Sequence, residues 1–196
     1  MSDVSQEEAA GSGGGRVVVA VSGFHGTGKS TYARLLAQRL GLRYVSAGMI
    51  FRQVARKRNM TLVQLSAEAA KEPSIDKDID DLQRIEAEKG NLVLDSLLAG
   101  WICRDLDAAK IYFEADTDIR IGRIASRDGI SLREAKETTL KREQIEIDRL
   151  KKYYGFDLSD LSIYDLVIDS SHLSIESCVN IIETFVVEWR ASKLSK

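Results

Sequence analysis

The sequence predicts an α/β protein in which helices cover both faces of a mostly parallel sheet. Three observations support this fold class. Five short runs rich in β-branched or apolar residues recur along the 196-residue chain, helical segments separate them, and a glycine-rich turn joins the first run to the first helix. Sheets built in this way bind their ligands beyond the carboxyl ends of the strands, so we expect the functional residues there.

The expected strands are short and have the composition of buried strands. The first, residues 16–22 (RVVVAVS), is a β-branched run without helical periodicity, which is typical of a strand inside a parallel sheet. The other four strands are expected at residues 42–46, 91–95, 109–115 and 165–170.

The expected helices occupy most of the remaining chain. Residues 29–41 carry apolar side chains at helical spacing, and Gly41 ends that helix. Further helical segments are expected at 47–89, with breaks near Asn59 and Pro73, at about 118–152, and at 174–193 as an amphipathic helix. Residues 1–15 are acidic and then Gly/Ser-rich, so we predict a disordered tail followed by one domain over 16–196.

Composition limits the partners. The formal net charge is −2, with 44% hydrophobic and 30% charged residues, which gives no global electrostatic reason to expect nucleic acid or an anionic membrane. No apolar run reaches the length of a membrane span, so we expect a cytoplasmic protein. Cys103 and Cys178 form no CxxC motif and are expected to be reduced, partly buried thiols. Because no exposed apolar stripe is evident, we expect a monomer.

The segment GFHGTGKS matches the phosphate-binding pattern G-x-x-x-x-G-K-[ST] at Gly23, Gly28, Lys29 and Ser30. Its glycines let backbone N–H groups surround a β-phosphate, Lys29 reaches the β- and γ-phosphates, and the Ser30 hydroxyl can bind Mg²⁺. Phe24 and His25 fill variable positions and receive no individual role. The loop residues expected to bind ATP are Gly23, Phe24, His25, Gly26, Thr27, Gly28, Lys29, Ser30 and Thr31.

A phosphate-binding loop alone does not distinguish kinases, GTPases, ATPases and binding proteins. A GTPase would need a guanine-binding N-K-x-D segment, which the sequence lacks, and a motor or transporter ATPase would need a much longer chain. A small protein with a second, arginine-rich segment fits a kinase of a small molecule better.

Arginines recur at helical spacing in the charged segment. Arg120, Arg123 and Arg127 share one helix face, and Arg142 and Arg149 share another with Glu146. A solvated helix with internal ion pairs would show the same pattern. Together with the phosphate-binding loop, the pattern favours a lid that closes over phosphates and excludes water, because phosphoryl transfer needs positive charge around the moving group.

Longer motifs resemble a known family. VSAGMIFR follows the second strand, LAGW follows the third, RIASRDGIS begins the lid, and residues 141–171 carry the most specific match. From about Val17 to Val187 the chain is similar to cytidylate kinases of the compact archaeal type, within the nucleoside monophosphate kinases. The resemblance implies a three-layer fold with a five-stranded parallel sheet, a helical acceptor-binding lobe at about 47–90 and a short lid at about 127–150. It implies transfer from ATP, with Mg²⁺, to CMP or dCMP.

The resemblance also assigns residues. Arg52 would hold the acceptor phosphate, Arg142 and Arg149 would bridge the donor and acceptor phosphates, and Glu146 would lie near the acceptor sugar. Arg123 and Arg127 match a helix that packs on the ATP base and phosphates, and Asp95 matches a carboxylate for hydrated Mg²⁺. The expected catalytic residues are thus Lys29, Arg127, Arg142 and Arg149; those binding ATP include Arg123; those binding the acceptor are Arg52, Gly100, Trp101 and Glu146; those binding metal are Ser30 and Asp95.

One departure from the family pattern concerns the acceptor. The family usually has E-G-R-L-A-G-W where this chain has DSLLAGW, so Leu97 stands in place of an arginine that contacts the acceptor nucleotide in the family. Met49 stands where the family often has an acidic residue. Three accounts stay open. Lys57, Arg56 or Arg104 supplies the missing cation to a weaker cytidylate kinase; the acceptor is AMP, UMP or a non-nucleotide; or the chain binds ATP without transferring phosphate.

Overall fold

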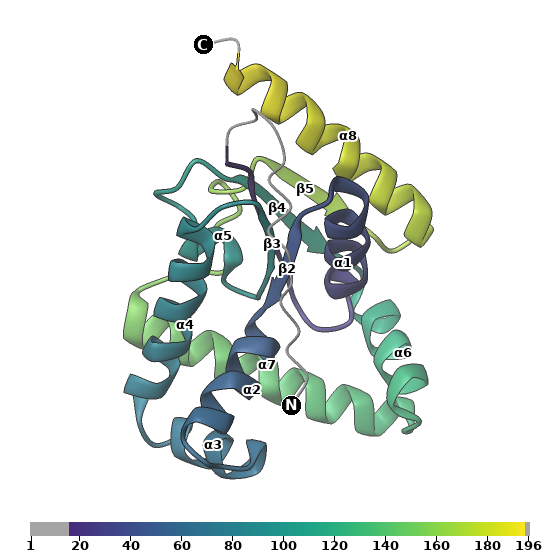
Figure 1. Ribbon diagram of the computed structural model, residues 1–196. Coiled ribbons are helices and arrows are strands. Elements are labelled where there is room, and N and C mark those ends of the chain that lie inside the picture. Colours follow the sequence, from purple (N-terminus) through teal and green to yellow (C-terminus); the bar gives the residue numbers. More distant parts are fainter. Residues whose placement is uncertain (1–15, 195–196) are drawn as a thin grey trace, which may run out of the picture.

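The computed structural model describes residues 16–194, which form a five-stranded parallel sheet with helices on both faces (Figure 1). The strands are β1 (Val18–Gly23), β2 (Arg43–Ser46), β3 (Leu92–Asp95), β4 (Ala109–Glu114) and β5 (Leu166–Asp169). Their order across the sheet is β2, β3, β1, β4, β5, and every neighbouring pair is parallel. The predicted fold class and all five strands are confirmed, with ends that differ from the prediction by one or two residues. The tail predicted for residues 1–15 lies outside the described residues.

Helices fill the connections between the strands. They are α1 (Lys29–Leu40), α2 (Ala47–Lys57), α3 (Leu62–Ala69), α4 (Pro73–Glu88), α5 (Ala99–Ile102), α6 (Thr117–Asp128), α7 (Leu132–Tyr154) and α8 (Ile175–Leu194). The breaks predicted near Asn59 and Pro73 separate α2, α3 and α4. The long charged stretch is divided at Gly129, which ends α6 with a positive φ of 67° that favours glycine.

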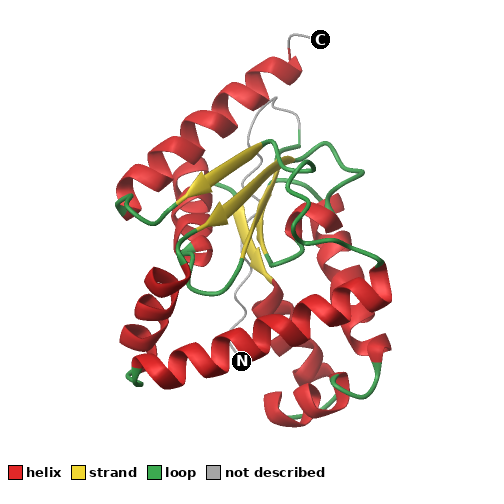
Figure 2. Cartoon of the chain, turned by 180° about the vertical axis from the view of Figure 1, so that it is seen from behind, coloured by secondary structure: helices red, strands yellow, loops and turns green. Residues whose placement is uncertain are grey.

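The three central strands, β1, β3 and β4, are largely buried on both faces, which explains why they lack polar alternation. Side chains of β1 alternate between two clusters: Val19 and Val21 pack with α1 and α8, whereas Val18 and Ala20 pack on the opposite face. Figures 1 and 2 show α1 and α8 on one side of the sheet and α4 and α5 on the other. The three-layer arrangement is therefore built around the central strand that leads into the glycine-rich loop.

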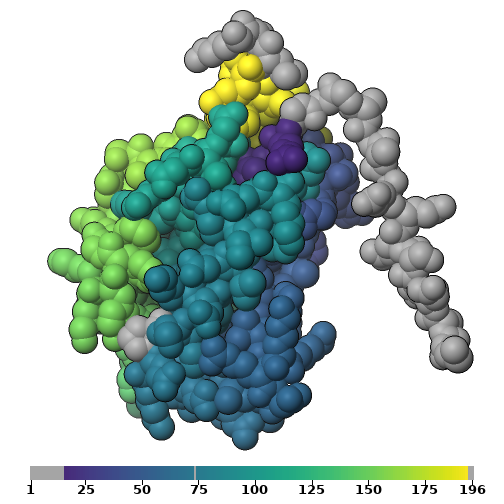
Figure 3. Space-filling model, turned by 60° about the vertical axis from the view of Figure 1, so that its left-hand side comes forward, coloured from purple at the N-terminus to yellow at the C-terminus, as the bar shows by residue number. Residues whose placement is uncertain are grey.

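Two groups of helices lie beyond the carboxyl ends of the strands. Helices α2, α3 and α4 pack around a hydrophobic cluster of their own, which includes Leu65 and Ile75. Helices α6 and α7 share another small cluster, and α7 crosses below the carboxyl edge of the sheet (Figure 2). In Figure 3 the end of α7 lies against α4 on one face of the molecule. These helices place side chains around the edge where ligands bind in parallel sheets.

Both cysteines are free thiols, and both are fully buried. Burial raises the pKa of Cys103 to about 12, so this thiol stays protonated. Within residues 16–194, no helix has the length and apolar character needed to cross a membrane.

Candidate active site

The phosphate-binding loop connects the end of β1 to the first residue of α1, as the sequence predicts. Gly28 adopts φ 89°, and a Cβ at this position would lie 2.5 Å from the Tyr32 hydroxyl, so only glycine fits there. The Thr27 hydroxyl donates a hydrogen bond to the Phe24 carbonyl at 2.9 Å and stabilises the turn. The positive end of α1 therefore faces the carboxyl edge of the sheet, where an anion would be stabilised.

A cleft of about 910 Å³ opens in front of this loop. It extends from α1 and the ends of β2 and β3 to the helices α2, α3 and α4, with α7 along its other side. Of the predicted site residues, those that line it are His25, Lys29, Ser30, Arg52, Asp95, Arg142, Glu146 and Arg149. Residues far apart in the sequence thus meet at the predicted edge. The volume lies within the range of small-molecule and cofactor sites.

Lys29 lies deep in this cleft. Burial lowers the pKa of Lys29, while the negative charges of Asp95 and Glu146 raise it. An additional anion would further stabilise the charged form of such a lysine, because each negative group offsets the free-energy cost of burying the ammonium. Lys29 is thus placed to bind phosphate.

Asp95 ends β3 directly beside β1, in register with Val21. It is 5% exposed, and its Oδ2 accepts a hydrogen bond from the Tyr44 hydroxyl at 2.7 Å. The residues that the structure describes contain no group of three or more His, Cys, Asp or Glu that could enclose a metal ion. One carboxylate and the Ser30 hydroxyl nevertheless fit Mg²⁺, because this ion usually keeps several waters and binds few protein ligands together with substrate phosphates.

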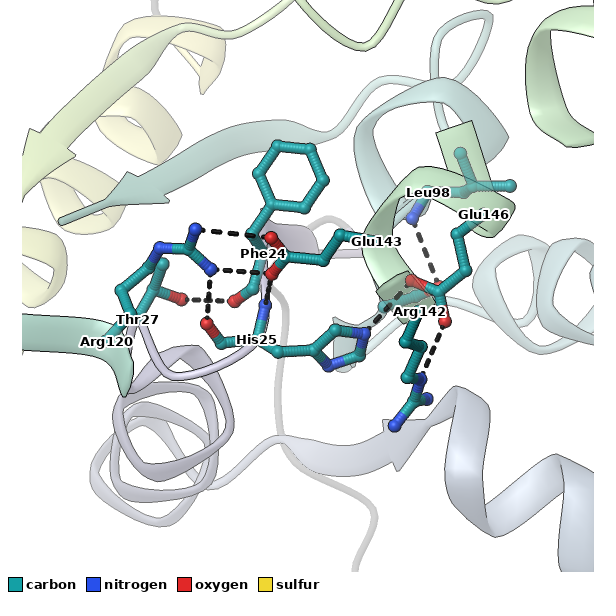
Figure 4. Close-up of polar contacts among 9 residues, drawn as sticks. Phe24, His25, Thr27, Leu98, Arg120, Arg142, Glu143 and Glu146 are labelled. Carbon is teal, nitrogen blue, oxygen red and sulfur yellow. Dashed lines mark hydrogen bonds and ion pairs between the residues drawn. The ribbon is translucent and has the colours of Figure 1, made fainter. Parts of the chain in front are cut away.

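Two glutamates of α7 hold the phosphate-binding loop at His25 (Figure 4). Glu143 Oε1 accepts a hydrogen bond from the His25 backbone N–H at 3.2 Å, and Arg120 Nη1 donates to the His25 carbonyl at 2.7 Å. Arg120 and Glu143 also pair with each other, at 2.6 and 3.2 Å, and both side chains are 8% exposed. Both backbone polar groups of His25 are therefore satisfied by one buried ion pair, which joins α6, α7 and the loop.

Glu146 lies one turn further along α7 and connects the loop to a predicted lid arginine. Its Oε2 lies 3.0 Å from His25 Nε2, and its Oε1 accepts from Arg142 Nε at 3.0 Å (Figure 4). Burial raises the pKa of Glu146, but the contacts with His25 and Arg142 outweigh it, so the pKa lies below its usual value. Glu146 is therefore ionised at neutral pH.

The second predicted lid arginine, Arg149, reaches across to the other side of the cleft. Arg149 Nη1 of α7 lies 2.8 Å from Asp76 Oδ2 of α4. The contact is an ion pair without hydrogen-bond geometry, since Asp76 Oδ2 and Arg149 Nε are both buried without a hydrogen-bond partner among the described residues. Burial raises the pKa of Asp76 and Arg149 lowers it, with a raised value as the net result. Both groups thus have unused hydrogen-bonding capacity beside the cleft.

Four residues that were predicted outside the phosphate-binding loop do not belong to the described lining of the cleft. Arg127 is exposed and pairs with its neighbour Asp128 at 2.7 Å. Arg123 Nη2 donates to the Ser170 carbonyl at 2.7 Å and supports the loop from behind. Gly100 packs against Tyr164, and Trp101 stacks on Phe156 with ring centroids 4.5 Å apart. In this conformation Arg123, Gly100 and Trp101 pack around the cleft without facing it, and Arg127 faces solvent.

The structure also shows which residues connected with the Leu97 replacement line the cleft, and it adds residues that the sequence analysis did not select. Leu97 lines the cleft, whereas Lys57, Arg56 and Arg104, the suggested replacements for the missing arginine, do not. Arg34 and Lys152 are additional cations in its lining. Helical spacing placed Arg120 on the correct face, but no sequence signal identified Glu143 as its partner, because the two lie on different helices.

A phosphate-binding loop that faces arginines from a second group of helices across one cleft is typical of P-loop kinases that act on small molecules, and the chain falls in that class. Similarity to known proteins agrees. The family described as "AAA domain" matches residues 19–151. The chain is 49% identical over 170 residues to a cytidylate kinase of Staphylothermus marinus, covering 87% of this chain and 96% of that protein. A cytidylate kinase of Ignicoccus hospitalis is 42% identical over 170 residues, with 87% and 99% covered.

At these identities and coverages, the chain belongs to the cytidylate kinase family. Among solved structures, the shikimate kinase of Bacteroides thetaiotaomicron superimposes with a TM-score of 0.61 at 15% identity, covering 87% of this chain and 98% of that one. A likeness at this identity shows the shared fold alone. The resemblance and the kinase class predicted from the sequence are confirmed.

Proposed function

We propose that the protein transfers the γ-phosphoryl group of ATP to CMP or dCMP and releases ADP and the nucleoside diphosphate. The observation that carries this proposal is the single cleft that joins Lys29 of the phosphate-binding loop to Arg142, Arg149 and Arg52 from other parts of the fold. The identity of 49% to a protein named cytidylate kinase supports the choice of acceptor.

In the proposed mechanism, an oxygen of the acceptor phosphate attacks the γ-phosphorus in line. This oxygen is already anionic, so the reaction needs no general base, and catalysis consists of positioning and charge stabilisation. Lys29 would hold the β- and γ-phosphates, and Arg52 would hold the acceptor phosphate. Arg142 and Arg149 would exchange their contacts with Glu146 and Asp76 for phosphate oxygens.

Ser30 and Asp95 would hold Mg²⁺, which neutralises phosphate charge when it is bound. The segment at about 127–150 would act as the lid and the segment at about 47–90 as the acceptor-binding lobe, with Gly129 as the joint between α6 and α7. Lid closure would exclude water and so prevent hydrolysis of ATP. Arg127 would reach the phosphates only in a closed form, because its side chain faces solvent here.

The other accounts of the Leu97 replacement are less well supported. The cleft contains Arg34 and Lys152 as further cations, so the loss of one arginine does not leave the acceptor side without positive charge. The phosphate-binding loop and both lid arginines are present, which argues against an ATP-binding protein without transferase activity. We also propose that the protein is a monomer that acts in the cytoplasm. Its partners would be ATP and a nucleoside monophosphate, and it would bind neither nucleic acid nor a membrane.

The test is a coupled assay of ADP release from ATP and Mg²⁺ with CMP, dCMP, UMP, AMP and GMP, with the Leu97→Arg variant in parallel. We expect CMP or dCMP to give the highest kcat/KM. The proposal fails if another acceptor is preferred by the wild type. It also fails if CMP gives a rate only after Leu97→Arg, because the wild type would then use a different acceptor or bind ATP without transferring phosphate.

A further inference from the structure

Gln83 is a buried glutamine in the wall of the cleft formed by α4. Its side chain is 1% exposed, yet the residue lines the cleft. Its Nε2 donates a hydrogen bond to Asp80 Oδ1 at 3.0 Å, while its Oε1 has no hydrogen-bond partner within the part of the chain that the structure describes. A buried carbonyl oxygen without a partner is costly, so proteins keep one mainly where a ligand or water supplies the donor.

Neighbouring groups fix the orientation of this amide. Asp80 accepts from Gln83 through Oδ1 and from the Tyr154 hydroxyl of α7 through Oδ2, at 2.8 Å. An ionised carboxylate only accepts hydrogen bonds, so the NH₂ group of Gln83 must face Asp80 and the carbonyl oxygen must face away from it. Burial raises the pKa of Asp80 to about 6, which leaves it ionised at neutral pH. The chain of Tyr154, Asp80 and Gln83 therefore presents a hydrogen-bond acceptor that cannot exchange places with a donor.

This polarity distinguishes nucleobases. Cytosine carries an amino group, a donor, at the position where uracil carries a keto oxygen, an acceptor. A fixed carbonyl oxygen binds the amino group and leaves the keto oxygen facing another acceptor. Sites that hydrogen-bond a substrate group reject analogues without that group far more strongly than apolar pockets do.

We propose that Gln83 Oε1 accepts a hydrogen bond from the exocyclic amino group of the acceptor base, and that Asp80 acts as the positioning residue that fixes the Gln83 amide for this task. The inference rests on the proposed function, since it assumes CMP as the acceptor. It assigns the choice of cytosine over uracil to α4 and leaves phosphate binding to the arginines of α2 and α7.

The first test is Gln83→Met, which keeps the length of the side chain and removes its polar atoms. We expect the ratio of kcat/KM for CMP to kcat/KM for UMP to fall about tenfold or more. The fall should come mainly from a higher KM for CMP, with little change in kcat/KM for UMP. Without ligand, the unpaired carbonyl is gone but Asp80 Oδ1 also loses the hydrogen bond from Gln83, so we expect a melting temperature close to that of the wild type. The matched control, Gln38→Met on the exposed side of α1, should leave the ratio unchanged.

The second test is Asp80→Asn. The amide introduced by this substitution has an NH₂ group that can donate to the Gln83 carbonyl, which lets the Gln83 amide turn its own NH₂ group toward the base. We therefore expect kcat/KM for UMP to rise while that for CMP falls, with unchanged ATP KM. A purely structural role for Asp80 would instead lower both rates together.

The inference is overturned if Gln83→Met lowers kcat/KM for CMP and kcat/KM for UMP by the same factor, since Gln83 would then contact the sugar or only support the fold. It is also overturned if the ratio does not change. A wild type that does not phosphorylate CMP contradicts the proposed function itself, whereas a wild type that uses CMP together with an unaffected ratio in both variants contradicts only the role of Gln83.

Discussion

The two sides of the cleft are held by different kinds of contact. On the proposed donor side, Arg120 and Glu143 are each 8% exposed and enclose His25 with reciprocal hydrogen bonds. On the proposed acceptor side, Arg149 and Asp76 are 33% and 18% exposed and meet in an ion pair with unfilled hydrogen-bonding positions. The difference indicates a phosphate-binding loop that is fixed before substrate arrives and arginines that can exchange partners when it does.

This comparison has a physical basis in the cost of rearrangement. A buried ion pair that loses one partner leaves an uncompensated charge, so it resists change. A partly exposed arginine loses little stabilisation when a phosphate replaces its carboxylate partner, because phosphate also offers oxygens that match the guanidinium. The donor side would therefore supply preorganised binding and the acceptor side the moving charges.

The largest effect is expected from Lys29→Ala. Removal of this ammonium would deprive the ATP phosphates of the cation that the phosphate-binding loop supplies, and we expect kcat/KM for transfer to fall by about 10³-fold or more. Steady-state ADP release measures it, and Lys89→Ala on an exposed lysine is the matched control. Residual transfer within tenfold of the wild type would contradict the assigned role of the loop.

The next effect concerns stability. Arg120→Met leaves the Glu143 carboxylate buried without a counter-charge, so the free energy of unfolding should fall by about 3–5 kcal/mol. Denaturant unfolding monitored by circular dichroism measures this change. Arg133→Met, which breaks an exposed pair on α7, should cost less than about 0.5 kcal/mol. The double variant Arg120→Met with Glu143→Met should recover part of the loss, because the buried charge is gone although the His25 N–H also loses its acceptor. Equal losses in the single and double variants would refute the buried-pair explanation.

The sequence predicted the sheet and the phosphate-binding loop well, because both depend on local patterns. The β-branched run before Gly23 and the glycine spacing up to Lys29 specify a strand, a turn and a helix within a few residues. The strand order, in contrast, could not be read from these patterns, since it depends on contacts between segments tens of residues apart.

The site was predicted less completely, for the same reason. Arg142 and Arg149 were selected by spacing and resemblance, and both line the cleft. Gln83 and Asp80 were not selected, because a glutamine in a charged helix has no distinguishing spacing. Only the fold shows that Gln83 is buried, that Asp80 is its partner, and that Tyr154 from α7 completes the chain.

A third prediction addresses the moving charges. Arg149→Lys keeps the positive charge but loses the planar fork that binds two phosphate oxygens at once, so kcat/KM for CMP should fall about 10- to 100-fold. Arg133→Lys applies the same change to an exposed position of the same helix and should have no effect on the rate. Equal rates for Arg149→Lys and the wild type would show that Arg149 serves only its ion pair with Asp76.

The smallest effect is a pH dependence that originates at Asp80. Burial raises its pKa from 3.8 to about 6, against the hydrogen bond from Tyr154 that lowers it; Asp76 and Asp81 also raise it, and Arg149 lowers it. The folded state therefore binds this proton more tightly than the unfolded state, and protonation between about pH 6 and pH 4 favours folding. At neutral pH the ionised carboxylate costs stability, and Asp80→Asn removes that cost at every pH.

The free energy of unfolding of Asp80→Asn minus that of the wild type should thus decrease by about 1–3 kcal/mol between pH 7 and pH 4.5. Denaturant unfolding of both proteins at the two pH values measures this difference, in which contributions from the other carboxylates largely cancel. A difference that does not change with pH would show that Asp80 titrates normally, so that its carboxylate would still fix the orientation of the Gln83 amide at pH 4.5.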